Sequence, residues 1–266
     1  MRRGQIRFFS LVAVLCFLAA ALSSPLIDNT QQGVDAQAAR ARKAQAEVRA
    51  AIELLNSQIA WPKDAPSVSL EIGDLPDSVN GQYNSALQQM HVTGRPVEPS
   101  LQLTLLHEAG HYFDMKIMAD AFLPKPLPLL SLPGGITLMP AQFSSREAKE
   151  LQAWRKAVRA SKLYQSLRGM LTNGKTPPPS GLTHFILYVT SDEEMWARSF
   201  AQTIAARSGS ALSQQTFDFV KPRWPLAGYW NADDFGPVSD EVIKVLESRG
   251  WLHPLKLKTS AATDRN

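Results

Sequence analysis

The segment Leu106–His111, with the sequence LHEAGH, constrains this chain more than any other part of it. Apolar residues recur around it at helical spacing, which predicts a helix that continues to about residue 122. His107 and His111 are four residues apart and therefore lie one turn apart on the same face of that helix. Two imidazoles placed in this way can bind one zinc ion, for which histidine nitrogens are common ligands.

Glu108 lies beside the first of these histidines, where its carboxylate can reach water on the metal rather than the metal itself. Zinc lowers the pKa of its bound water to about 7, and a neighbouring carboxylate can take the proton as hydroxide attacks a carbonyl. The His-Glu-x-x-His pattern therefore predicts metal-dependent hydrolysis with Glu108 as the general base. The alternative is a structural helix that carries two partly exposed histidines and a surface glutamate.

The basic charge of the chain comes from its N-terminus. The 266 residues include 28 basic and 24 acidic side chains, a net charge of +4. Three of the arginines lie in residues 1–23, which contain no acid, so the rest of the chain has 25 basic against 24 acidic side chains. This near balance gives no support to nucleic-acid binding, which depends on clustered basic residues.

Residues 1–23 have the pattern of a secretory signal peptide. A cationic start precedes an apolar core from Phe8 to Leu22, and small residues follow at the end of that core. The alternative is an uncleaved anchor, although about 15 apolar residues fall short of the roughly 20 that cross a bilayer. We expect a secreted or periplasmic protein that contacts the membrane only if this segment is retained. The single cysteine, Cys16, lies in it, so the mature chain has no thiol ligand and no disulfide.

The remaining sequence predicts one domain of mixed class. A hydrophobic content of 44% fits a globular protein with a buried core. We expect a single domain over residues 24–255, with a partly proline-rich insertion at about 123–182 and a disordered tail at 256–266. The fold class is α+β, with mostly helical additions to a small sheet.

Helical and alternating patterns predict the elements around the metal-binding helix. They indicate helices over residues 35–57 and 145–172, and strands over 66–72 and 86–92. The second strand precedes the metal-binding helix, where zinc peptidases have an edge strand that binds extended substrate; an ordinary sheet strand is the alternative. A C-terminal helix is expected to begin at Ser239 and to end at Gly250.

Two histidines leave a catalytic zinc one protein ligand short. The third histidine of metzincins is absent, because Asp114 and Ile117 occupy the positions of its glycine and histidine. The other candidates are two histidines and the acids of the next predicted helix: His184, His253, Asp192, Glu193 and Glu194. Glu194 can turn toward the first helix, but it also fits a capping box with Ser191.

His107–Asp114 and Glu194–Phe200 together resemble the paired motifs of gluzincin metallopeptidases of the anthrax lethal factor type. The resemblance implies that Glu194 is the third zinc ligand, with Glu193 as the fallback. It also implies that Tyr188 stabilises the reaction oxyanion and that Asp114 supports a metal ligand from behind.

The second motif departs from the family pattern at two positions. Met195 replaces an aromatic residue, and Arg198 stands where the family has an acid. The simplest use of Arg198 is an ion pair with Asp192 or Glu194 of its own helix.

With these departures, the resemblance implies a zincin-like domain that holds Zn²⁺ and hydrolyses a protein or peptide substrate. Two alternatives differ in function. The first is a catalytically idle zincin fold that serves as an envelope binding or assembly protein, and the second is an amidase that acts on a non-peptide amide, such as one in the cell wall. Glu108 favours an enzyme over a scaffold, because a scaffold needs no general base.

Overall fold

The computed structural model describes residues 27–254, apart from residues 64, 66, 78, 96, 122–145 and 173–177. The predicted signal segment, the proline-rich start of the insertion and the C-terminal tail therefore lie outside the described residues. The described chain combines many helices with one small sheet, which agrees with the predicted α+β class. Among the described helices, none is long and apolar enough to cross a membrane.

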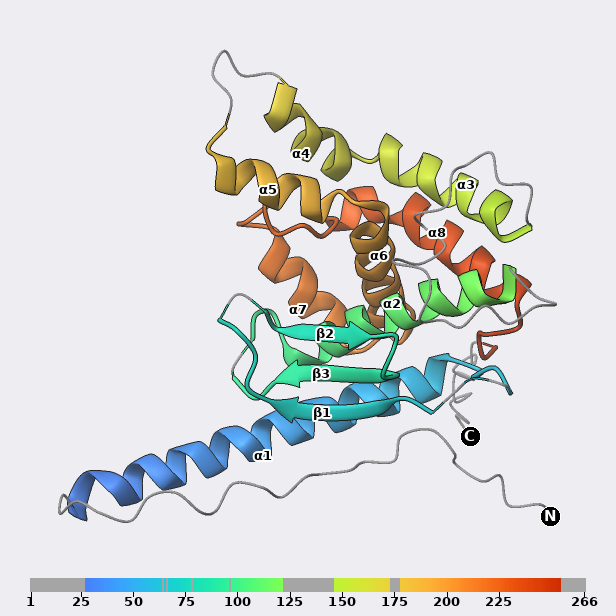
Figure 1. Ribbon diagram of the computed structural model, residues 1–266. Helices are drawn as coiled ribbons and strands as arrows, with labels where there is room; N and C mark the ends of the chain where they lie inside the picture. The colour runs from blue at the N-terminus through green and yellow to red at the C-terminus, as the bar shows by residue number, and fades with distance from the viewer. Residues whose placement is uncertain are drawn as a thin grey trace, which may run out of the picture.

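The sheet has three strands in the order β1-β3-β2, as Figure 1 shows. They are β1 (Ser69–Gly73), β2 (Gly81–Asn84) and β3 (Gln89–Thr93). β3 pairs in parallel with β1 and antiparallel with β2. The strand predicted over residues 86–92 is thus the central strand β3, and the alternative of an ordinary sheet strand is confirmed. The edge strand that contacts the helix of His107 and His111 is β2.

The two longest described helices are α1 (Ile27–Gln58) and α2 (Leu101–Ala121), and α2 packs against β2 and β3. Two side chains accept backbone N–H groups at the start of α2. The Ser100 hydroxyl accepts the backbone N–H of Leu103 at 3.2 Å, and the Glu47 carboxylate of α1 accepts the N–H of Leu101 at 2.8 Å. Because free N–H groups at a helix start need acceptors, these bonds join the beginning of α2 to α1.

Six further helices complete the described chain. They are α3 (Arg146–Ala160), α4 (Lys162–Thr172), α5 (Ser180–Val189), α6 (Asp192–Arg207), α7 (Ala211–Val220) and α8 (Ala232–Ser248). The helix expected over 145–172 is interrupted at Ser161, and the expected start of α8 at Ser239 is wrong. Asn231 caps α8 instead, since its side chain accepts the N–H of Asp234 at 3.0 Å. The helix tolerates the internal Pro237.

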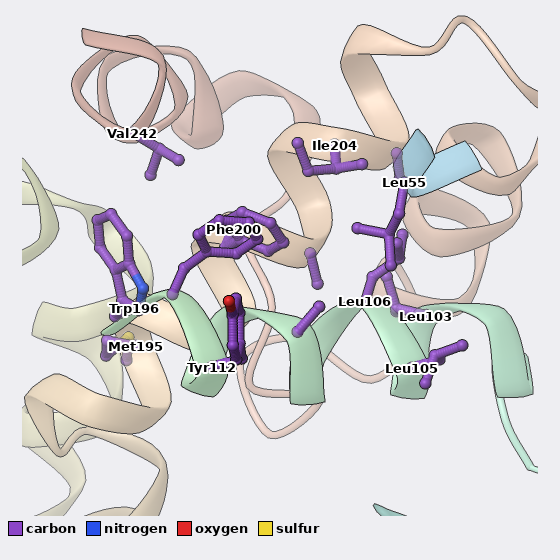
Figure 2. Packing of buried hydrophobic residues seen from close by; sticks show 14 of the residues in the cluster. Leu55, Leu103, Leu105, Leu106, Tyr112, Met195, Trp196, Phe200, Ile204 and Val242 are labelled. Carbon is purple, nitrogen blue, oxygen red and sulfur yellow. The ribbon is translucent and has the colours of Figure 1, made fainter. Parts of the chain in front are cut away.

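The core is built around the crossing of α2 and α6. Figure 2 shows Leu106 and Tyr112 of α2 with Phe200 and Ile204 of α6 and Leu55 of α1, and each of these side chains is at most 2% exposed. Burial of such large apolar side chains is the main favourable contribution to folding. The crossing therefore fixes how the two helices face each other.

Gly110 of α2 lies directly against the backbone of α6. A Cβ atom added to Gly110 would lie 2.7 Å from the Cα of Ala197 and 3.0 Å from its carbonyl oxygen. The indole N–H of Trp196 donates to the Gly110 carbonyl at 3.1 Å, which joins α6 to α2 next to this contact. Only a glycine allows the two backbones to lie so close.

Replacing Gly110 by alanine is expected to lower the free energy of unfolding by about 1–2 kcal/mol. Alanine gains about 1 kcal/mol in helix propensity, but the added methyl group meets backbone, which yields less than a side chain, so overpacking here costs about 2–3 kcal/mol, the upper part of its usual range. Urea unfolding of Gly110→Ala measures the effect. Gly181→Ala is the control, because a Cβ there meets no atom within 4 Å. An unchanged or higher stability of Gly110→Ala would contradict this packing.

Candidate metal centre

Helix α2 presents both histidines of the sequence motif on one side. The Nε2 atoms of His107 and His111 lie 3.1 Å apart, and the two rings stand edge to face with centroids 4.7 Å apart. Their side chains are only 12% and 23% exposed. The one-turn spacing of the sequence has thus brought two imidazole nitrogens to a single point, as predicted.

Glu194, in the first turn of α6, completes this cluster. Its Oε2 lies 3.4 Å from His107 Nε2, and its Oε1 lies 3.5 Å from His111 Nε2. Ser191 caps α6 by accepting the backbone N–H of Glu194 at 3.4 Å. The cap therefore uses the serine side chain and the glutamate backbone, while the Glu194 carboxylate is directed to the histidines.

The spacing of these three donors suits a metal ion. Ligand atoms of His107, His111 and Glu194 all lie within 4.8 Å of one another, and this group could hold an ion. Tetrahedral zinc with bonds of about 2.0–2.1 Å has donor atoms about 3.3 Å apart, close to the distances found here. The other candidate ligands are not in this group: among the described residues, this triad is the one set of three such side chains whose donor atoms lie close enough to share an ion.

Glu108 is buried beside the triad without being part of it. It is 4% exposed, and burial raises its pKa to about 7 against the opposing effects of His111 and a hydrogen bond from the Tyr83 backbone. Gly81 of β2 lies so close that an added Cβ would sit 2.6 Å from Glu108 Oε1. The carboxylate is therefore enclosed between α2 and the edge strand β2.

Electrostatics differ between the two histidines. Burial lowers the pKa of His107 to about 4, with a smaller opposing effect from Glu194. Burial also lowers the pKa of His111, but Glu194, Glu108 and Asp114 outweigh it and hold its pKa above the ordinary value. Neutral imidazole is the form that binds a metal, and His107 favours it at neutral pH.

The carboxylate of Glu194 is held in its ionised form. Burial alone would raise its pKa, but hydrogen bonds with His107 and His111 and the charge of Arg198 hold the pKa far below the usual range. An ionised carboxylate is the form that binds metal ions. Glu194 is thus both positioned and charged as a ligand requires.

Tyr188 and Asp114 both lie close enough to the triad to interact with it electrostatically. Tyr188, near the end of α5, is 57% exposed, while burial of part of its side chain, the charge of the Glu194 carboxylate and a hydrogen bond with that carboxylate raise its pKa. Its hydroxyl end is therefore directed toward the triad. Asp114 is buried at 2% exposure, and its charge acts on His111.

Some backbone N–H and C=O groups of β2 point away from β3, at the edge of the sheet. In an antiparallel pair, hydrogen-bonded residue pairs alternate with non-bonded pairs. The N–H of Thr93 donates to Asn80 at 2.9 Å, so Gln82–His91, two residues further along, is also a hydrogen-bonded pair. The N–H and C=O groups of Gly81 and Tyr83 therefore point away from β3. The Tyr83 hydrogen bond to Glu108 agrees with this direction.

The segment between α7 and α8 contributes a residue that the sequence analysis did not associate with the site. The Arg198 guanidinium carbon lies 5.4 Å from the ring centroid of Tyr229. Burial raises the pKa of Tyr229 to about 12, and the charges of Arg198, Glu194 and Glu108 all act on it. No local pattern marks Tyr229, because its position near Glu194 depends on long-range packing.

Comparisons of the chain with protein-family models, with curated proteins and with solved structures return no match. The assignment of the site therefore depends on its own residues and their geometry.

We expect the protein to bind about one Zn²⁺ per chain and to lose about tenfold or more in affinity when His111 or Glu194 becomes alanine. Each variant removes one of three converging donors. Equilibrium dialysis with metal analysis measures the binding. His184→Ala, an exposed histidine of α5, is the matched control and should keep the parent affinity. Retention of full affinity by Glu194→Ala would show that the triad is not the binding site.

Proposed function

We propose that this protein is a zinc-dependent peptidase of the gluzincin type. The observation that carries the proposal is the convergence of His107, His111 and Glu194, with Glu108 buried beside them and left out of the ligand set. Two histidines and one carboxylate form a known catalytic zinc set that leaves one position open. A structural zinc site would use four protein ligands.

Each residue around the triad has a separate role in the proposed hydrolysis. Zinc bound there would supply Lewis acidity, which polarises a carbonyl and makes water more acidic. Glu108 takes the proton of the attacking water and later gives it to the departing amine. Tyr188 donates a hydrogen bond to the oxyanion that develops on the carbonyl.

The edge strand β2 supports a peptide as the substrate. The N–H and C=O of Gly81 and the C=O of Tyr83 point outward and can pair with an extended chain, as in other cases of strand addition to a sheet edge, while the Tyr83 N–H is already bonded to Glu108. The same strand touches Glu108 through Gly81 and through the Tyr83 N–H. A peptide that pairs with β2 would therefore bring its backbone close to the general base.

The place of action is part of the same proposal. A cationic and apolar N-terminal segment favours export, so the enzyme would act on proteins or peptides outside the cytoplasm.

Glu108→Gln is expected to lower kcat for peptide hydrolysis by about 10²–10⁴-fold or more, because the amide cannot accept the proton. Its zinc affinity should stay within about threefold of the parent, since Glu108 is not a ligand. A mixed library of fluorogenic peptides measures activity, and dialysis measures zinc. If the parent holds zinc but cleaves no peptide, the peptidase proposal fails and an envelope binding role or another amide substrate replaces it.

Tyr188→Phe is expected to lower kcat about tenfold or more with little change in KM, since the hydroxyl acts on the oxyanion and not on the bound substrate. Steady-state kinetics on the best peptide of the library tests this. Tyr164→Phe on α4 removes a tyrosine hydroxyl from another helix and should leave both constants unchanged. An equal effect of the two substitutions, or a change confined to KM, would argue against this role.

A further inference from the structure

Arg198 lies one helical turn after Glu194 on α6 and contacts it directly. Its Nη2 donates to Glu194 Oε2 at 3.2 Å, and the two side chains are 12% and 7% exposed. The sequence left Asp192 open as an alternative partner. The structure directs Asp192 elsewhere, since its carboxylate pairs with Arg155 at 2.9 Å and with Arg159 at 3.6 Å.

The other side of the guanidinium contacts the segment between α7 and α8. Nη1 donates to the carbonyl of Gly228 at 3.4 Å, and the guanidinium lies over the ring of Tyr229. Gly228 has a φ of +71°, and an added Cβ would clash with Arg198 Nη1. Glycine at 228 is therefore needed both for the backbone conformation and for the approach of the arginine.

Arg198 thus joins two parts of the chain that are far apart in sequence. A planar guanidinium can donate in two directions at once, which a lysine ammonium on a flexible stem does less well. A nearly buried charge is also costly unless its partners stay in place, so the bridge favours one arrangement of Glu194 and of the Gly228–Tyr229 segment.

We propose that Arg198 is a positioning residue that fixes the rotamer of Glu194, holds its Oε2 so that Oε1 is offered to the metal, and holds the Gly228–Tyr229 segment beside the site. This inference depends on the proposed metal site, and its consequence is a preorganised ligand. A residue that orients a ligand from behind typically contributes about 10–100-fold to metal affinity.

The experiment compares Zn²⁺ affinity of the purified protein and its variants by competition with a chromophoric chelator. Arg198→Met removes the bridge, Arg198→Lys keeps the charge without the planar fork, and Gly228→Ala displaces the arginine without changing any charge. The control is Arg159→Met, which removes an arginine that is 57% exposed and pairs with Asp192. Circular dichroism and thermal unfolding verify the fold of each variant.

We expect the dissociation constant for Zn²⁺ to rise about 10–100-fold in Arg198→Met, with smaller but clear increases in Arg198→Lys and Gly228→Ala, and no change in the control. The visible absorption of Co²⁺ bound to the protein should also change in the three variants, because the geometry of the carboxylate ligand changes. If Arg198→Met does not fold, the lysine and glycine variants provide the same comparison.

Affinities within about threefold of the parent would overturn the proposal, because Arg198 would then contribute nothing to the positioning of the ligand. Tighter binding by Arg198→Met would overturn it as well, because the arginine would then act only by repelling the ion. A parent that binds no Zn²⁺ overturns both this inference and the proposed function. A parent that binds Zn²⁺ with these variant effects but cleaves no peptide overturns the peptidase function alone.

Discussion

The contact between Gly110 of α2 and Ala197 of α6 is the constraint on which the site depends. His107 and His111 belong to one helix and Glu194 belongs to the other, so the distance between the helices decides whether three donor atoms can meet. An added Cβ at Gly110 would lie 2.7 Å from the Ala197 backbone, and Trp196 donates to the Gly110 carbonyl beside it. Close packing between two small residues therefore places the carboxylate within 3.5 Å of both imidazoles.

The helical periodicity of α6 places its packing residue and two of its charged residues on the same side. Glu194, Ala197 and Arg198 are three and four residues apart and lie on one side of the helix. Ser199 points away from that side, and its hydroxyl accepts the indole N–H of Trp154 from α3 at 3.1 Å. α3 lies within the predicted insertion, yet Trp154 is fully buried and packs on Trp196 with ring centroids 5.5 Å apart. This part of the insertion thus helps to hold the helix that carries the carboxylate.

Local sequence patterns were sufficient to predict the half of the site that lies on α2. His107, Glu108 and His111 follow one another within a single helix, so helical geometry alone places them together. Glu194 required the paired motif, since no local rule says which distant acid meets a helix. The edge strand β2 and Tyr229 could not be found in this way, because their positions near Glu108 and Arg198 follow from long-range packing. The predicted start of α8 at Ser239 is wrong because Asn231 caps this helix, which tolerates the internal Pro237.

Buried charge connects the two halves of the site. Glu108, Glu194 and Arg198 are all largely removed from water, and such groups are costly unless each has partners. Arg198 is shared between Glu194 and the Gly228 carbonyl, while Glu108 is held by the Tyr83 N–H. The two carboxylates therefore have different surroundings: one is held ionised between three cationic or hydrogen-bonding groups, and the other has a pKa of about 7. Different environments for two acids are how a protein assigns one to bind and the other to exchange protons.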